Sequence, residues 1–80
     1  MYILIHVVSQ TAANASRIAL ERAGIYASVK KTPSSISKSG CGFCLRILPE
    51  QLSRARAVLK ESAVKIQGIY EVRGENIRRI

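Results

Sequence analysis

Apolar positions in the first half of the chain change from a continuous run to a helical period and then to alternation. Residues 2–8 are almost entirely apolar and rich in β-branched and aromatic side chains, which is typical of a central, covered strand. Ser9 suits the N-cap of a helix that runs to about Ala23, with Gly24 as the helix stop. Alternation over residues 25–31 predicts a second strand.

The second half of the chain repeats this order after a serine-rich segment. Residues 42–48 alternate between large apolar and other side chains, which predicts a third strand. Pro49 suits the first turn of a helix over about residues 50–62, where apolar positions recur every three or four residues. A last strand is predicted over residues 64–72, with inward positions at Val64, Ile66, Gly68, Tyr70 and Val72.

Two β-α-β halves of similar length predict one α+β domain over residues 1–73. In the ferredoxin-like βαββαβ plan, a four-stranded antiparallel sheet carries two helices on one face, and right-handed crossovers give the strand order 4-1-3-2. Residues 74–80 have no readable period. We expect them to form a basic C-terminal tail that either frays or packs against a partner.

Alternation also assigns side chains to the two faces of the predicted sheet. If Ile3, Ile5, Val7 and Phe43 face the helices, the open face presents Tyr2, Leu4, His6, Cys44 and Arg46. A soluble monomer rarely leaves such an apolar patch bare. The open face is therefore a candidate homodimer surface.

The length and the net charge limit the classes of protein to which the chain can belong. The chain has 80 residues, enough for one hydrophobic core, and lacks the run of about 18 apolar residues that a membrane span needs. Residues 2–8 follow no basic segment and precede no cleavage pattern, and two cysteines three positions apart make no disulfide framework, so we expect a soluble, cytoplasmic protein with free thiols. Thirteen Lys and Arg against five Asp and Glu give a net charge of +8, which favours anionic partners.

The strongest candidate for chemistry is Cys41, which lies between Gly40 and Gly42 where a serine-rich loop enters the third strand. Glycines adopt backbone angles closed to other residues, so the two flanking N–H groups are able to converge on the sulfur or on a bound anion. Positive charge in the same region comes from Lys30, Lys31, Lys38 and Arg46. Because cationic surroundings favour the thiolate, we expect a lowered pKa for Cys41.

Cys41 and Cys44 also form a Cys-x-x-Cys pair, which raises the alternatives of a disulfide and a metal site. If the segment is extended, their Cα atoms lie about 10 Å apart, whereas a disulfide needs about 7 Å or less, so closure requires a turn at Gly42. A structural zinc site needs four ligands, and the chain offers two thiols and His6, so we expect no metal. Cys44 is most simply a small buried residue, with a second reactive thiol as the alternative, and His6 is most simply structural.

Several short motifs occur in an order and spacing that resemble one known family. They are Ala23-Gly24-Ile25, Pro33, Ile36-Ser37, Ser39-Gly40-Cys41-Gly42, Leu45-Arg46 and Gly68-Ile69-Tyr70-Glu71-Val72. Over residues 2 to about 72 the sequence is similar to short bacterial proteins of the selenium/sulfur carrier protein-like (DUF3343) family. The resemblance implies a Cys-Gly carrier site at Cys41 and Gly42, with Arg46 in support.

We therefore expect a sulfur or selenium carrier in which Cys41 accepts a persulfide or selenosulfide atom and passes it to a partner protein. The sequence contains no Ser-His-Asp set, carboxylate pair or phosphate-binding loop, so we expect neither an enzyme nor a cofactor. One alternative is a nucleic-acid-binding module that uses the open face and the basic charge, although the aromatic pair of RNA-binding sheets is missing. Another is a dimerisation or regulatory module with an inert thiol.

Overall fold

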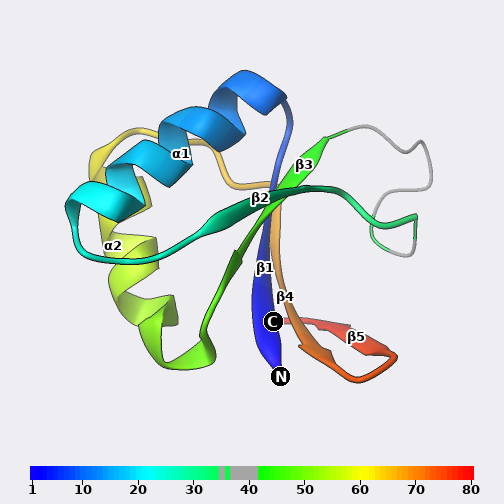
Figure 1. Ribbon diagram of the computed structural model, residues 1–80. Helices are drawn as coiled ribbons and strands as arrows, with labels where there is room; N and C mark the ends of the chain where they lie inside the picture. Colours follow the sequence, from blue (N-terminus) through cyan, green and yellow to red (C-terminus); the bar gives the residue numbers. More distant parts are fainter. Residues whose placement is uncertain (35, 37–41) are drawn as a thin grey trace.

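The computed structural model describes residues 1–34, 36 and 42–80. In chain order, its described elements are β1 (Tyr2–Val7), α1 (Gln10–Arg22), β2 (Ser28–Lys31), β3 (Phe43–Ile47), the 3-10 helix η1 (Pro49–Gln51), α2 (Leu52–Glu61), β4 (Gly68–Arg73) and β5 (Asn76–Arg79). The strands form one antiparallel sheet in the order β2-β3-β1-β4-β5, and Figure 1 shows both helices on one side of it. The predicted ferredoxin-like βαββαβ plan and the relative order of its four strands are confirmed.

The central strand β1 is apolar along most of its length because both of its faces are covered. Ile3, Ile5 and Val7 are at most 1% exposed and form the main core together with residues of both helices. On the opposite face, Leu4 is 3% exposed and belongs to a second, smaller cluster. A strand buried on two faces needs a near-continuous apolar run, which residues 2–8 supply.

Both helices lie where the sequence predicts them. The Ser9 hydroxyl oxygen accepts a hydrogen bond from the Ala12 N–H at 3.1 Å, which makes Ser9 the N-cap of α1. Gly24 follows the helix with a φ of +81°, a conformation that favours glycine. The second predicted helix is divided, because the turn at Pro49 is 3-10 and the α-helix proper starts at Leu52.

Two predicted strands start three or four residues later than expected, and for the last one the predicted inward set is wrong. The second strand starts at Ser28 rather than at residue 25, and the last starts at Gly68. Ile69 of β4 joins the helix-side core, whereas Tyr70 and Val72 lie in the second cluster on the other face. Val64 and Ile66 do pack against the core, but from the segment before the strand. A one-residue change of phase between that segment and β4 therefore exchanges the faces.

The sheet has five strands rather than the predicted four. Gly74, with a φ of +56°, and Glu75 connect β4 to β5 through a two-residue turn. β5 pairs antiparallel with β4 from Asn76 to Arg79. The sequence gives little sign of this strand because Ile77 is the one apolar residue within it. Residues 74–80 thus include a strand of the sheet.

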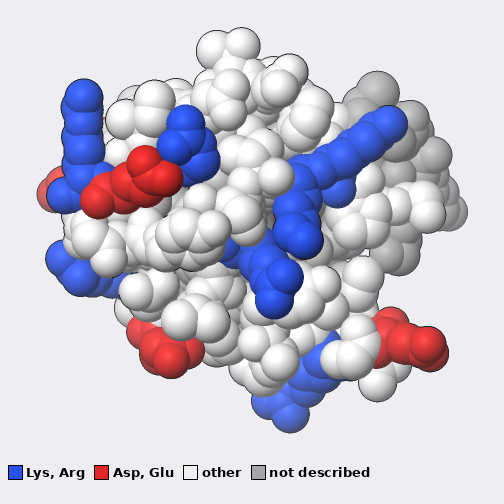
Figure 2. Space-filling model, in the orientation of Figure 1, with Lys and Arg blue, Asp and Glu red and all other residues white. Residues whose placement is uncertain are grey.

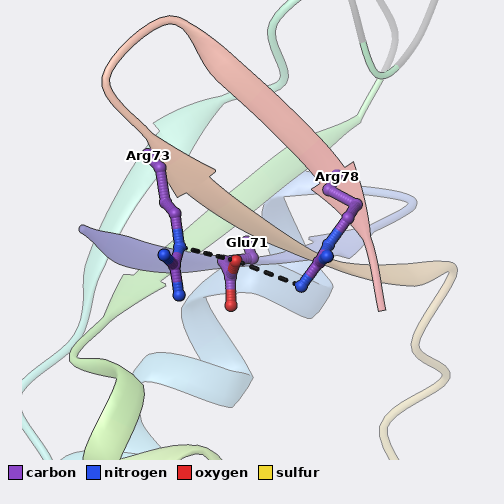
Figure 3. Close-up of polar contacts among 3 residues, drawn as sticks. All are labelled: Glu71, Arg73 and Arg78. Carbon is purple, nitrogen blue, oxygen red and sulfur yellow. Dashed lines mark hydrogen bonds and ion pairs between the residues drawn. The ribbon is translucent and has the colours of Figure 1, made fainter.

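Two kinds of side-chain contact add to the backbone pairing between β4 and β5. Ile77 packs into the second cluster. On the other face of the sheet, Glu71 forms ion pairs with the guanidinium groups of Arg73 and Arg78 (Figure 3). Arg73 Nε lies 2.9 Å and an Arg78 terminal nitrogen 3.3 Å from the same carboxylate oxygen of Glu71. The arginines are largely exposed, so these ion pairs contribute less than their number suggests.

Candidate functional site

The site predicted from the sequence is described at one end only. Cys41, Gly40 and Lys38 lie outside the described residues. Gly42, Cys44 and Arg46 are described, and they lie at or along β3, the strand between β1 and β2. The geometry of the site is therefore built from the surroundings of Gly42, the residue that follows Cys41 in the chain.

Gly42 occupies a position that only glycine fits. Its φ is +98°, outside the range that other residues readily adopt. A Cβ at this position would lie 2.7 Å from Nε2 of His6 and 2.9 Å from the carbonyl oxygen of Val7. The Gly42 carbonyl accepts a hydrogen bond from the Thr32 N–H at 3.3 Å. Gly42 is thus fixed between the end of β1 and the residue that follows β2.

His6 is the side chain nearest to a Cβ placed at Gly42, a relationship that the sequence did not predict. In the sheet, His6 is opposite Cys44 on one side and Gly68 on the other. Its backbone carbonyl accepts a hydrogen bond from the Gln67 N–H at 2.8 Å. A lone histidine in an apolar strand gives no sign of its neighbours, because the register between β1 and β3 decides them.

Cys44 is a buried thiol with a hydrogen-bond partner. Its side chain is 0% exposed and packs in the second cluster with Leu4 and Val72. The thiol donates a hydrogen bond to the hydroxyl oxygen of Thr32 at 3.6 Å. Burial raises the pKa of Cys44, and its hydrogen bond with Thr32 only partly opposes this. The protonated form is therefore favoured, whereas the thiolate is the nucleophile.

Arg46 has its described contact away from Gly42. Its guanidinium carbon lies 4.2 Å from the centre of the Tyr2 ring, a cation–π contact at the start of β1. Arg46 is four positions after Gly42, about 13 Å away at the rise of a β-strand. The lysines of β2 are nearer in register, since Lys31 is opposite Phe43 and Lys30 is opposite Cys44. Positive charge near Gly42 thus comes first from β2.

The open face carries the predicted residues but is not the bare patch that the sequence suggested. Leu4, Cys44 and Val72 are each at most 3% exposed. The residues packed around them come from β1, β4, β5 and the segment after β2, namely Tyr2, Ile36, Tyr70 and Ile77. The chain thus buries the middle of this face within its own fold, and a homodimer through it stays a prediction.

The described residues hold no group of three or more His, Cys, Asp or Glu side chains placed to bind one metal ion.

Among the described segments, no helix has both the length and the apolar character that crossing a membrane requires.

Comparison with known protein families places the chain in a class. Residues 2–71, nearly the whole chain, match the family described as "Putative Se/S carrier protein-like", so the chain belongs to this family. The resemblance inferred from the sequence motifs is confirmed. Neither the curated proteins nor the solved structures give a match.

Proposed function

We propose that the chain carries sulfur or selenium on Cys41 and delivers it to a partner protein. Membership of the Se/S carrier protein-like family supports the class of function. The chain has two cysteines, and the observation that carries the choice between them is the burial of Cys44. Its thiol is shielded from donors, is hydrogen-bonded to Thr32 and has a raised pKa, so Cys41 is the thiol left for transfer.

Loading follows from thiol chemistry and needs no oxidant. The Cys41 thiolate attacks the terminal sulfur of a donor persulfide, R–S–SH. A new S–S bond forms, the S–S bond of the donor breaks, and R–S⁻ leaves with the electron pair. The product is Cys41–S–SH, and a donor R–S–SeH gives Cys41–S–SeH in the same way. Delivery repeats the exchange, with a nucleophile of the acceptor attacking the terminal atom.

The described surroundings support this assignment in two ways. Gly42 is fixed between β1 and β2, which attaches the Cys41 segment to the end of a central strand. Lys30 and Lys31 lie in register with the first residues of β3 and add positive charge that favours a thiolate. Gly40, Lys38 and Arg46 complete the proposed support of Cys41. The chain itself turns over no substrate in this proposal.

Mass measurement after loading tests the carrier proposal. The protein is incubated with a cysteine desulfurase and cysteine, which together supply an enzyme-bound persulfide. We expect a gain of one sulfur atom that Cys41→Ser abolishes and Cys44→Ser retains. The proposal is wrong if the folded wild-type protein gains no sulfur or if Cys41→Ser still gains it.

Alkylation kinetics test the activation of the thiol separately. We expect iodoacetamide to modify Cys41 with a pH midpoint below that of a free thiol, because of the cationic surroundings. Lys30→Gln and Lys31→Gln should each raise the midpoint, and Arg46→Gln reports whether that arginine contributes. A profile equal to that of a free thiol in the Cys44→Ser background would contradict activation.

The open face gives less support to nucleic-acid binding. RNA-binding sheets stack bases on exposed aromatic side chains of the central strands. Here Leu4 and Cys44 are buried in the middle of that face, and the Tyr2 ring is covered by Arg46. The basic charge alone favours loose, salt-sensitive binding rather than a specific site.

A further inference from the structure

The outer edge of β2 is a row of backbone groups that no described strand pairs with. β2 is the last strand of the sheet on its side. The Thr32 N–H bonds to the Gly42 carbonyl, which marks these residues as a hydrogen-bonded pair of the antiparallel ladder. Because hydrogen-bonded and non-bonded pairs alternate, the N–H and C=O groups of Val29 and Lys31 point away from β3. This edge offers donors and acceptors to an added strand.

A cleft adjoins this edge and combines positive charge with exposed apolar surface. Its volume is about 580 Å³, within the range of ligand-binding sites. Tyr26 and Leu48 in its wall are 77% and 54% exposed and leave apolar surface accessible beside the positive charge. The cleft also contains Lys30, Arg46 and the side chain of Gln51, whose buried Oε1 has no hydrogen-bond partner among the described residues.

The charge of this region has one sign. The lining residues of the cleft include no Asp or Glu. In Figure 2, Lys and Arg side chains extend across the middle of the face where Figure 1 places β2 in front. Lys31, the exposed last residue of β2, extends the positive surface beyond the cleft. The surface therefore complements a negatively charged ligand.

We propose that the edge of β2 docks an extended, acidic segment of a partner protein as an additional antiparallel strand. The segment's backbone bonds to the outward groups of Val29 and Lys31, as in other cases of strand addition. Its carboxylates lie beside Lys30 on one face of β2 or Lys31 on the other, as cross-strand neighbours, and Arg46 of β3 adds positive charge one strand further in. An apolar residue of the segment fills the space between Tyr26 and Leu48.

The charges argue against a second copy of the chain at this edge. Pairing β2 with the same strand of another copy would bring Lys30 and Lys31 of both copies together, and like charges across strands are destabilising. Lysines on edge strands protect against such self-pairing. Nucleic acid matches the charge but leaves the outward backbone groups and the exposed Leu48 without use. A peptide satisfies all three features.

The test uses the full chain and a capped peptide of sequence Thr-Val-Glu-Val-Glu-Val-Thr, followed by amide chemical shifts in NMR titrations. We expect the largest shifts at Val29, Lys31 and Tyr26. The peptide with Gln in place of Glu should bind about three- to tenfold more weakly, since each cross-strand charge pair contributes modestly. A peptide with Pro at the central Val should lose binding, because the backbone bonds are removed.

Variants of the chain separate charge from backbone recognition. The double variant Lys30→Glu/Lys31→Glu should bind a peptide with Lys in place of Glu better than the Glu peptide. The control Arg54→Glu/Lys60→Glu makes the same charge change on the exposed side of α2 and should still prefer the Glu peptide. Lys31→Pro should weaken binding more than Lys31→Ala, since both lose the charge and only proline loses the outward N–H.

Several results would overturn the proposal. In the peptide titrations these are equal binding of the Glu and Gln peptides, or chemical-shift changes centred on β5 or the open face. The proposal is also wrong if a single-stranded oligonucleotide binds at β2 in preference to the peptide, or if the chain self-associates through β2. Cys41→Ser should leave peptide binding unchanged. Failure of sulfur loading and failure of peptide docking are therefore independent outcomes.

Discussion

Gly42 and His6 are in such close contact that a Cβ on Gly42 would lie 2.7 Å from Nε2 of the imidazole. Real Cβ atoms essentially never approach other atoms this closely, and the same Cβ would lie 2.9 Å from the Val7 carbonyl oxygen, a backbone atom that cannot turn aside as a side chain can. The residue after Cys41 is therefore constrained by β1 as well as by its own backbone conformation.

Replacing Gly42 should destabilise the fold more than replacing Gly24. Both glycines have positive φ, +98° and +81°, but a Cβ at Gly24 meets nothing within 4 Å. We expect Gly24→Ala to cost about 1 kcal/mol from backbone strain alone, and Gly42→Ala to cost about 2–4 kcal/mol because the clash is added. Urea denaturation followed by circular dichroism measures both.

A double-mutant cycle identifies the imidazole as part of this cost. In the His6→Ala background, Gly42→Ala should be less destabilising, since only the Val7 carbonyl remains in the way. Additive effects of His6→Ala and Gly42→Ala would contradict the contact, as would equal costs at Gly42 and Gly24.

The Cys44 thiol should make stability depend on pH above neutrality. Its pKa is raised from an ordinary value of 9.0, chiefly by burial. The folded state therefore holds this proton to higher pH than the unfolded state. The contribution to the free energy of unfolding is complete below about pH 9 and is lost as pH rises through the folded-state pKa.

The measurement compares wild-type protein and Cys44→Ala by urea denaturation between pH 7 and 10.5, since the other titrating groups are common to both. We expect the difference in free energy of unfolding between the wild-type protein and Cys44→Ala to become smaller toward pH 10.5. In the Cys41→Ser background, native protein should also resist iodoacetamide until it is unfolded. A constant difference across the pH range, or rapid alkylation of the folded variant, would contradict the burial of Cys44.

Removing the Ser9 cap should weaken α1. Its hydroxyl oxygen satisfies the Ala12 N–H at 3.1 Å, one of the donors without a partner inside the helix. We expect Ser9→Ala to lower the free energy of unfolding by about 1 kcal/mol and Ser9→Asp to preserve most of it. Thermal denaturation compares the variants. Equal losses for Ala and Asp would show that the hydrogen bond is not what Ser9 contributes.

The apolar contact should hold β5 more firmly than the ion pairs. Ile77 packs in the second cluster, so we expect Ile77→Ala to cost about 1–2 kcal/mol. The side chain of Arg78 is 75% exposed, so Arg78→Ala should cost less than about 1 kcal/mol despite its bond to Glu71. Amide hydrogen exchange in β5 and urea denaturation measure both, and the reverse ranking would contradict this account.

Local patterns were sufficient for most of the fold and for part of the site. The Ser9 cap, the Gly24 stop and the apolar positions of β1 are statements about neighbouring residues, and the structure confirms them. Alternation also assigned Leu4, His6, Cys44 and Arg46 to the correct face. It was wrong for β4, because the segment with Val64 and Ile66 continues the apolar pattern without continuing the strand. The length of an alternating apolar pattern in the sequence does not show at which residue the strand starts to pair with its neighbour.

The sequence by itself determined the order of strands and helices, the positive charge and the glycine-flanked cysteine, since these depend on residues close together in the chain. Only the tertiary structure decided that His6 meets Gly42, that Cys44 is sealed beside Thr32, and that β5 completes the sheet. The reason is that pairing register joins residues far apart in sequence, and burial on the open face depends on what the rest of the chain places over it.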